Sequence, residues 1–473
     1  MRTSRLPYCF HLLSGRLPFR VLELHKTYGS VVRIAPDELV FADARAWRDI
    51  MGHRAAGEPE MEKAKIFYRG RANAPTTLLN ADRDDHGKLR RLLAHGFSER
   101  SMREQQPIIM RYVDLLIRRL HENSQGGTNK LDMVKWYNYT TFDVIGDLTF
   151  GEPFGCLENS DYHPWVSMIF AGIKFGAYGL TSRSLPWVQR LVMALVPRGL
   201  AKKREEHLKL TKEKLLKRMN MGASRPDLIE GLLRKHQDVG EKGKNDHHHD
   251  DNDDDDIVMD VHRLQLSCSG LIVAGSETTA TLLSGVTYLL GRNPDKLARL
   301  TAEVRSAFQR EDEIDFASAS RLNYLLACLD EGLRIYSPTP LGLPRSVPKG
   351  GWTIAGHYVA EDTIVSQYHY ALYHNEEFFT APEEFHPERW LGDPRFATDN
   401  RDIFQPFHVG PRNCVGRNLA YVEMRVILAR TLWNFDLKLA EDSQNWIREQ
   451  KIYLLWEKQA LNVYLVPRKF EQS

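Results

Sequence analysis

Residues 407–416 read Phe-His-Val-Gly-Pro-Arg-Asn-Cys-Val-Gly and place one cysteine, Cys414, among glycines. A thiolate can bind iron through its sulfur, and glycines allow the backbone to pass close to a flat macrocycle. The alternative is a structural cysteine buried in a glycine-rich turn. We favour the iron ligand, because this spacing of residue types rarely arises by chance. The spaced positions are Phe407, Gly410, Arg412, Cys414 and Gly416.

A second candidate for chemistry is the sequence Ala-Gly-Ser-Glu-Thr-Thr at 274–279, in the middle of a long apolar stretch. A glycine followed by hydroxyl residues can open the hydrogen-bond ladder of a helix and leave a carbonyl free. An acid beside a threonine, here Glu277 beside Thr278, can supply protons to a buried reaction centre. Taken alone, such threonines more often pack, and such a glutamate more often faces water.

The third candidate is an ion pair between Glu331 and Arg334, which share one face of a predicted helix. An exposed pair at this spacing would contribute only about 0.2–0.5 kcal/mol. The flanking leucines indicate burial instead, where such a pair must be fully hydrogen-bonded or it destabilises the fold. Arg389, in Phe-His-Pro-Glu-Arg-Trp at 385–390, is a plausible third member.

These motifs, in this order, resemble those of the cytochrome P-450 superfamily over nearly the whole chain. The resemblance implies haem b (iron protoporphyrin IX), with Cys414 as the metal ligand and Phe407, Gly410 and Gly416 in the surrounding loop. Backbone N–H groups beyond the cysteine are expected to hydrogen-bond to its sulfur. Arg412 is expected to pair with a haem propionate, because a planar guanidinium matches a carboxylate.

The same resemblance assigns residues 274–279 to the oxygen-activation helix of the family, with Ala274 and Gly275 beside the haem. Thr278 is then the hydroxyl that delivers protons and stabilises oxygen, and Glu277 is the associated acid. The three residues of the predicted ion-pair cluster match the structural lock behind the haem, a role in holding the cysteine loop.

Further propionate contacts are implied at His86, Arg90 and Arg345. His86 and Arg90 lie one helical turn apart, so their side chains share a face. Many family members have Trp where this chain has His86, so this assignment departs from the common pattern.

Bulk composition excludes some classes of function. Lys and Arg number 64 against 62 Asp and Glu, so no global positive field favours nucleic-acid binding. Five cysteines without a Cys-x-x-Cys pattern indicate a reducing compartment rather than a disulfide framework. Residues 1–16 have no apolar run long enough to span a bilayer. We expect peripheral contact with the cytosolic face of the endoplasmic reticulum, by resemblance, or a soluble cytoplasmic form.

Helical periodicity dominates the chain, which predicts a mainly α fold with small β-sheets. The resemblance implies that this is the cytochrome P-450 fold. The haem is expected between a long central helix at 258–290 and the cysteine loop. A transmembrane span is the alternative for 258–290, but the hydroxyl residues in its middle favour the core of a soluble fold. We expect one catalytic domain at 17–473 after a residual segment at 1–16.

An acidic, flexible insert is expected at about 237–256, where His247–His249 precede a run of aspartates. Weak binding of a divalent metal there is the alternative. The other expected elements are helices at 18–28, 44–51, 86–95, 105–121, 132–150, 294–308, 322–336 and 417–435, strands at 31–34, 38–41, 352–354, 358–359 and 363–366, and a C-terminal hairpin of 452–455 with 461–466.

The resemblance implies a monooxygenase that hydroxylates or epoxidises an apolar organic substrate with O2 and two electrons. The chain has no flavin or nicotinamide motif, so an NADPH-dependent cytochrome P-450 reductase is the implied partner. Arg91, Arg412 and Arg417 are its expected docking face. The alternative is a haem-thiolate isomerase or dehydratase acting without O2. Such variants often lose the acid–threonine pair, so Glu277 and Thr278 count against it.

The amino-terminal sequence is similar to that of filamentous-fungal members of the family that act in secondary metabolism, such as isotrichodermin hydroxylase-like enzymes. This similarity suggests a terpenoid or polyketide substrate of the mycotoxin type. The apolar residues expected to line the substrate pocket are Leu78, Phe170, Phe175, Leu341 and Leu343.

Overall fold

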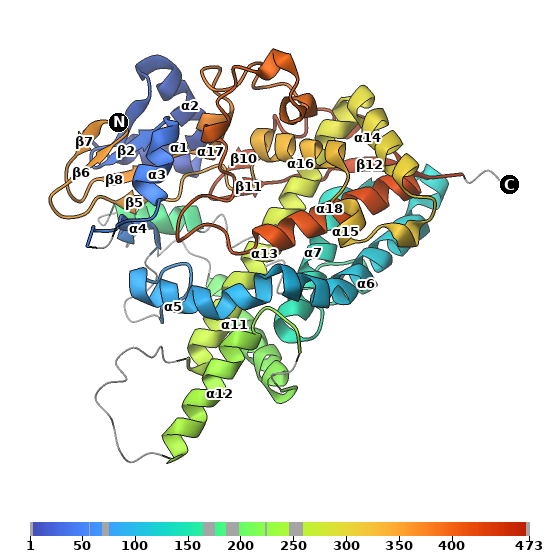
Figure 1. The fold of residues 1–473 in the computed structure, drawn as a ribbon, viewed down its shortest axis with the longest axis horizontal. Coiled ribbons are helices and arrows are strands. Elements are labelled where there is room, and N and C mark those ends of the chain that lie inside the picture. Colours follow the sequence, from blue (N-terminus) through green and yellow to red (C-terminus); the bar gives the residue numbers. More distant parts are fainter. Residues whose placement is uncertain are drawn as a thin grey trace.

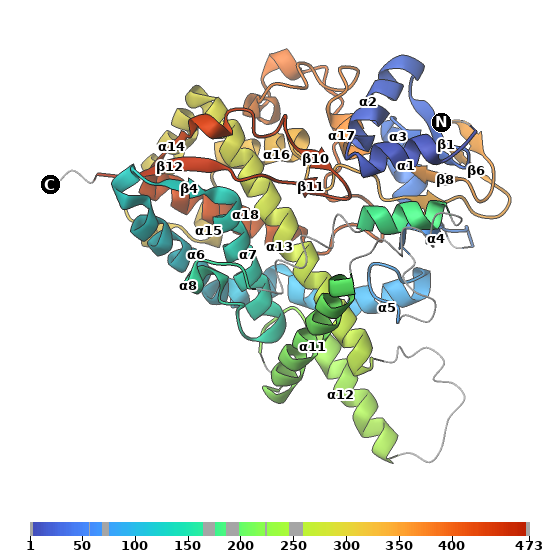
Figure 2. The same cartoon turned by 180° about the vertical axis from the view of Figure 1, so that it is seen from behind.

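Helix α13 (Val261–Arg292) crosses the middle of the molecule, and the other long helices pack around it (Figure 1; Figure 2). The computed structural model describes residues 3–55, 57–68, 75–163, 176–185, 198–222, 225–245 and 259–469. Asp260 caps the first turn of α13, since its side chain accepts the N–H of Arg263. The main neighbour of α13 is α7 (Met133–Phe150), which is buried on nearly every side, as befits a central helix.

The mainly α class with small separate sheets, expected from the sequence, is confirmed. The remaining helices are α1 (Leu6–Leu13), α2 (Leu17–Tyr28), α3 (Ala44–Met51), α4 (Lys65–Tyr68), α5 (Arg83–Ala94), α6 (Glu99–Ser124), α8 (Cys156–Asn159), α11 (Arg198–Asn220), α12 (Glu230–Asn245), α14 (Pro294–Ala307), α15 (Phe316–Ala319), α16 (Asn323–Ile335), α17 (His369–Tyr373) and α18 (Arg417–Asn434).

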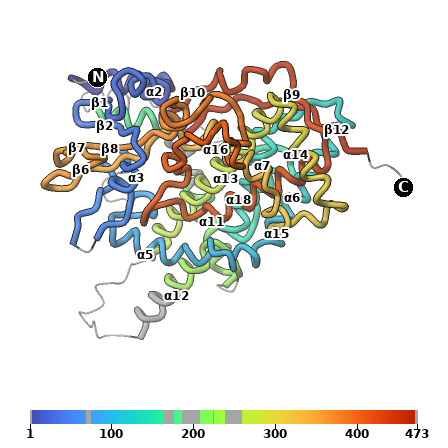
Figure 3. Tube along the Cα trace, turned by 45° about the horizontal axis from the view of Figure 1, so that its top comes forward, coloured from blue at the N-terminus to red at the C-terminus, as the bar shows by residue number. Residues whose placement is uncertain are grey.

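The larger sheet has the order β1-β2-β8-β5-β3, from strands Val31–Ala35, Glu38–Phe41, Ile364–Ser366, Arg345–Ser346 and Glu62–Lys63. It lies at one end of the molecule with α1 and the hairpin β6–β7 (Trp352–Ile354, His357–Val359), whereas β12 (Asn462–Pro467) lies at the other end (Figure 3).

The predicted C-terminal hairpin is wrong in its pairing. Strand β10 (Lys451–Ile452) pairs with β11 (Trp456–Glu457) in a tight turn of its own. Strand β12 instead lies between β9 (Phe435–Leu439) and β4 (Lys130–Asp132). Both partners follow or precede helices that pack on α13, so the pairing depends on tertiary contacts rather than on a local turn.

The residual segment expected at 1–16 is integrated into the fold. Helix α1 buries Tyr8, Cys9 and Leu12, and Arg5 pairs with Glu38 at 2.9 Å. Residues 237–245 of the expected acidic insert continue α12, and the rest of that segment, including His247–His249, lies outside the described residues. Among the helices that the structure describes, none is long and apolar enough to cross a membrane.

A fully buried ion-pair cluster joins α16 to the segment that leads toward the cysteine loop. Glu331 accepts from Arg334 at 2.8 and 3.0 Å and pairs with Arg389 at 3.3 Å, and all three side chains are inaccessible. Arg334 also donates to three backbone carbonyls, and Arg389 pairs with Asp399. The indole N–H of Trp390 donates to Glu331 at 2.9 Å. The predicted burial and convergence are confirmed, and Asp399 and Trp390 are members that the sequence did not reveal.

Replacing Glu331 with Gln should lower the free energy of unfolding by about 3–5 kcal/mol, because two buried guanidinium groups lose their shared carboxylate. Denaturant unfolding of the variant and the parent chain measures this change. Glu23→Gln is the matched control, since Glu23 forms an exposed pair with Arg20 and should change stability by less than about 1 kcal/mol. Equal losses in both variants would contradict the assignment.

Candidate functional site

The cysteine loop is closed by its own backbone and seated on helix α3. The N–H of Cys414 donates to the carbonyl of Phe407 at 2.9 Å. Gly410 has a φ of 76°, and a Cβ there would overlap the carbonyl oxygen of Met51, so only glycine fits. Helix α18 begins three residues beyond Cys414, at Arg417. The loop therefore fixes the sulfur at the amino end of a buried helix.

Cys414 is accessible to solvent although protein surrounds most of its sulfur. Burial raises the pKa of its thiol, and this effect is opposed by the N–H of Gly416 and by the charges of Arg90 and Arg417. The N–H of Gly416 is one backbone group beyond the cysteine that favours the charged sulfur. A Cβ on Gly416 would lie 3.9 Å from the sulfur, in ordinary van der Waals contact with it. Such surroundings suit a thiolate whose charge is shared with a metal ion.

Helix α13 presents an accessible strip on an otherwise buried surface. Ala274 is exposed and Thr278 is half-buried, whereas Ser276, Glu277 and Thr279 are buried. Ala274 and Thr278 are four residues apart and share a face, and Thr278 Oγ1 donates to the Ala274 carbonyl at 2.7 Å. The structure thus brings two predicted site residues together on one accessible face.

Gly275 has a packing role in this structure. A Cβ there would lie 2.6 Å from Cδ1 of Ile145, so its side faces α7. The helix is continuous at this point and hydroxyl groups bond back to carbonyls one turn earlier, as Ser276 does to Ile272 at 2.5 Å.

Glu277 does not point along the accessible strip with Thr278. Its carboxylate is buried and pairs with Nζ of Lys458, which also donates to Oγ1 of Thr281 at 2.6 Å. Sequence reasoning missed Lys458, because the stretch Trp-Glu-Lys-Gln reads as an ordinary surface turn.

Five cationic or basic side chains gather beside the cysteine loop: Lys63, His86, Arg90, Arg345 and Arg412. Burial and the charges of Arg412 and Arg345 lower the pKa of Lys63 to about 7. Burial, then Lys63 and the three arginines, lower the pKa of His86 to about 3, so His86 is neutral near pH 7. Burial also lowers the pKa of Arg345, whose Nη1 has no hydrogen-bond partner among the residues that the structure describes.

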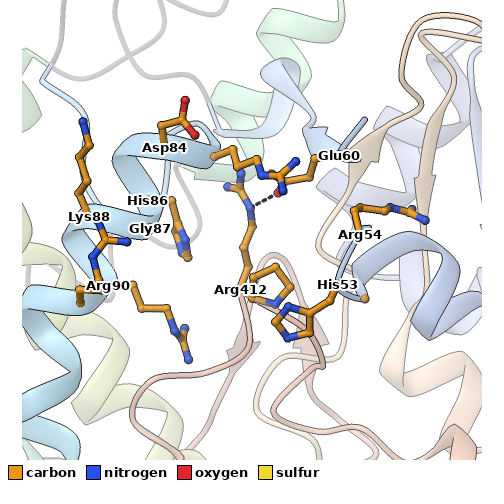
Figure 4. Close-up of a pocket in the computed structure, with 13 residues that line it drawn as sticks. His53, Arg54, Glu60, Asp84, His86, Gly87, Lys88, Arg90 and Arg412 are labelled. Atoms are coloured by element: carbon orange, nitrogen blue, oxygen red, sulfur yellow. Dashed lines mark hydrogen bonds and ion pairs between the residues drawn. The ribbon is translucent and has the colours of Figure 1, made fainter. Parts of the chain in front are cut away.

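The partners of these side chains differ from simple propionate contacts. Arg90 donates to the carbonyl of Asn413 at 2.6 Å, so it braces the cysteine loop. Arg412 rises between α5 and residues 53–54 and pairs with Glu60 at 2.5 Å (Figure 4). Its side chain is only 7% exposed, so Arg412 cannot be part of the docking face expected from the sequence, whereas Arg91 and Arg417 are exposed.

A pocket of about 570 Å³ lies above this cluster and is lined by His86, Arg90, Arg412, Arg54 and Glu60 among others (Figure 4). Positive charge exceeds negative charge here, and like charges at short range destabilise one another. Two carboxylates would relieve that repulsion and satisfy Nη1 of Arg345. The donor set therefore fits the propionates of a haem whose iron meets the Cys414 sulfur.

Glu423 is a buried acid that the sequence analysis did not single out. It lies on α18, is 2% exposed, and interacts with Thr279 of α13. Burial raises its pKa to about 8. A signal was present, because Glu423 falls among apolar residues of a helix whose later turns are fully buried. The apolar residues expected around the substrate are partly described: Leu341 is buried and Leu78 and Leu343 are half-buried, whereas Phe170 and Phe175 lie outside the described residues.

Comparisons with known proteins agree with this geometry. The family model described as cytochrome P450 matches residues 3–463. The chain is 49% identical to the cytochrome P450 monooxygenase tpeC of Talaromyces stipitatus, over 99% of this chain and 88% of that protein. It is 45% identical to the trichothecene C-15 hydroxylase of Fusarium sporotrichioides, over 98% and 91%. It is 43% identical to the averantin hydroxylase of Dothistroma septosporum, over 99% and 86%.

Arg345→Met should release haem faster and stabilise the haem-free chain. A charge-assisted hydrogen bond contributes about 1.5–3 kcal/mol, so haem loss should accelerate by about 10- to 100-fold. Without haem, the substitution removes one of several crowded cations. Transfer of haem to an apoglobin and thermal unfolding of the haem-free protein measure the two effects. Arg91→Met, at an exposed position in the pocket that His86, Arg90 and Arg412 also line, is the control, and equal haem loss from both variants would contradict the propionate role.

Glu423 should make stability fall as the pH rises from 4.5 to about 8. In this window the folded chain keeps the proton of Glu423 and the unfolded chain has lost it, so the contribution is complete below pH 4.5 and disappears above about 8. Unfolding midpoints across this range should flatten in Glu423→Gln relative to the parent. Glu99→Gln, an exposed position on α6, is the control and should leave the slope unchanged.

Proposed function

The chain belongs to the cytochrome P450 family, and we propose that Cys414 is the thiolate ligand of its haem iron. The observation that carries this proposal is the accessible sulfur of Cys414, fixed by a closed loop at the start of α18. The N–H of Gly416 and the charges of Arg90 and Arg417 favour the ionised sulfur. The other four cysteines are buried: Cys9, Cys156, Cys268 and Cys328.

The protein is a haem-thiolate monooxygenase, and relatives covering nearly its whole length are named as monooxygenases and hydroxylases. A thiolate-ligated haem supplies the electron density that favours cleavage of the O–O bond. Thr278 is proposed as the hydroxyl that delivers protons, since it lies on the accessible strip of α13. Glu277 is proposed as the acid that serves it. The alternative of an isomerase acting without O2 finds no support among these relatives.

The haem carboxylates are proposed to lie against the cationic cluster. One guanidinium nitrogen of Arg345 has no hydrogen-bond partner among the described residues. The charge of Lys63 interacts with those of Arg345 and Arg412, so the three cations lie close together. His86 is proposed as a neutral hydrogen-bonding group rather than a cation. Arg90 acts from the other side, by holding Asn413 and by its charge near Cys414.

A monooxygenase of this family requires electrons from a redox partner, and we propose an NADPH-dependent reductase. Arg91 and Arg417 are exposed on the side of the cysteine loop and present positive charge there. Such charge steers an acidic partner toward the face nearest the iron. Arg412 is excluded from this surface because it is paired with Glu60.

The substrate is proposed to be an apolar secondary metabolite, a terpenoid or a polyketide. The names of two relatives refer to a trichothecene and to averantin. The exposed Leu6 and Phe10, four residues apart on α1, support peripheral contact with a membrane surface, which we propose to be the cytosolic face of the endoplasmic reticulum.

Cys414→Ser should abolish the strongly red-shifted Soret band of the reduced, carbon-monoxide-bound protein, because the band requires a thiolate on iron. Cys9→Ala, which alters a buried thiol of α1, should keep the band. Difference spectra of the three proteins measure it. A red-shifted band that persists in Cys414→Ser, or a parent spectrum typical of an imidazole ligand, would refute the assignment of Cys414.

A further inference from the structure

Lys458 forms a buried ion pair with the acid of the central helix. Its side chain is 3% exposed and that of Glu277 is 2% exposed, and the two residues are far apart in sequence. The ammonium also donates to Oγ1 of Thr281 at 2.6 Å, one helical turn after Glu277. Thr281 Oγ1 donates in turn to Glu277 at 3.4 Å. The ammonium of Lys458 thus contacts two side chains of α13, those of Glu277 and Thr281.

The turn that carries Lys458 is held firmly against the core. Trp456 of β11 stacks on Tyr336, with ring centroids 4.4 Å apart and an interplanar angle of 26°. The indole N–H of Trp456 donates to the carbonyl of Ser337 at 2.8 Å. Tyr336 itself packs where a Cβ on Gly285 of α13 would stand. The backbone next to Lys458 is therefore fixed relative to α13, which gives the ammonium a defined position.

Stability alone does not explain this pair. Buried ion pairs often stabilise a fold no more than apolar residues of similar volume do. The second carboxylate oxygen of Glu277 has no hydrogen-bond partner among the described side chains. Among the described residues, Tyr162 and Tyr336 interact with the charge of Glu277: burial is the main cause that raises the pKa of both, and that charge adds to it. Among these neighbours, Lys458 alone brings positive charge.

Glu277 and Thr278 are adjacent on a helix, so their side chains diverge by about 100°. Thr278 lies on the accessible strip, and Glu277 is turned into the buried side by Lys458. We propose that Lys458 is the positioning residue of proton delivery, which holds Glu277 as a carboxylate beside Thr278. This inference rests on the proposed roles of Thr278 and Glu277. Without the ammonium, Glu277 would be an unpaired buried charge and would take up a proton.

The test compares Lys458→Met, Glu277→Gln and the conservative Lys458→Arg in the full chain. The infrared difference spectrum between Lys458→Met and the double variant Lys458→Met/Glu277→Gln should contain a carboxylic-acid C=O band from Glu277. The difference spectrum between the parent chain and Glu277→Gln should lack this band. This readout reports the proton on Glu277 and does not depend on turnover. Lys451→Met, an exposed lysine on β10, is the matched control and should leave Glu277 ionised.

A second measurement is the hydrogen peroxide released per NADPH oxidised, with a cytochrome P450 reductase as the electron donor. Poor proton delivery lets O2 leave as peroxide after two electrons and two protons, instead of continuing to O–O cleavage. The peroxide fraction should rise several-fold in both Lys458→Met and Glu277→Gln and stay at the parent level in Lys458→Arg. All variants should keep the red-shifted carbon-monoxide spectrum, because none touches Cys414.

The outcomes distinguish the proposed role of Lys458 from the proposed role of Glu277. A rise in Glu277→Gln with none in Lys458→Met, or an ionised Glu277 in Lys458→Met, overturns the role of Lys458 alone. An unchanged peroxide fraction in Glu277→Gln refutes the role of Glu277, and the role of Lys458 with it. Should Lys458→Met fail to fold, Lys458→Gln keeps a donor without the charge and must give the same band and the same rise.

Discussion

The Cys414 sulfur lies between a closed glycine loop and the first turn of α18, where one backbone N–H and two arginines oppose the desolvation of a negative charge. Much of the surrounding structure serves that arrangement. Gly410 allows the loop to touch the backbone of Met51, and Arg90 reaches across from α5 to hold Asn413. These contacts fix the loop that carries the sulfur.

The lock around Glu331 stabilises the same region from behind. Its two arginines donate to backbone carbonyls at 373, 380, 382 and 384, so the long irregular segment before the cysteine loop is tied to α16. Irregular backbone carries many polar groups that need partners, and two guanidinium groups can satisfy several of them at once. A buried cluster with this many partners gives one defined path to a chain segment that lacks regular secondary structure.

Charged side chains are distributed unevenly in the fold, although the net charge of the chain is only +2. Cations gather where an anionic cofactor edge is expected, and burial, together with their mutual repulsion, lowers the pKa values of Lys63, His86 and Arg345. On α13, the buried charge of Glu277 is matched by Lys458. The first site is suited to bind carboxylates, and at the second the ammonium of Lys458 pairs with a buried carboxylate.

Elements with strong local signals were predictable. The helices at 18–28, 44–51 and 132–150 and the strands at 31–34 and 38–41 were expected close to where they lie, because periodicity and capping act within a few residues. The C-terminal hairpin was predicted wrongly, since β12 pairs with strands that lie more than twenty residues away in the sequence. Arg412 was misassigned to the docking face for a related reason: burial by Glu60 cannot be read from a loop sequence.

The sequence by itself determined the chemistry of the loop, because Phe407, Gly410, Arg412, Cys414 and Gly416 are neighbours on one short stretch whose spacing fixes their geometry. Only the tertiary structure decided which way Glu277 turns and what opposes its charge. That choice depends on Lys458, which lies 181 positions further along the chain and is brought to α13 by the stacking of Trp456 on Tyr336. Packing between distant segments sets such contacts, and no local pattern encodes them.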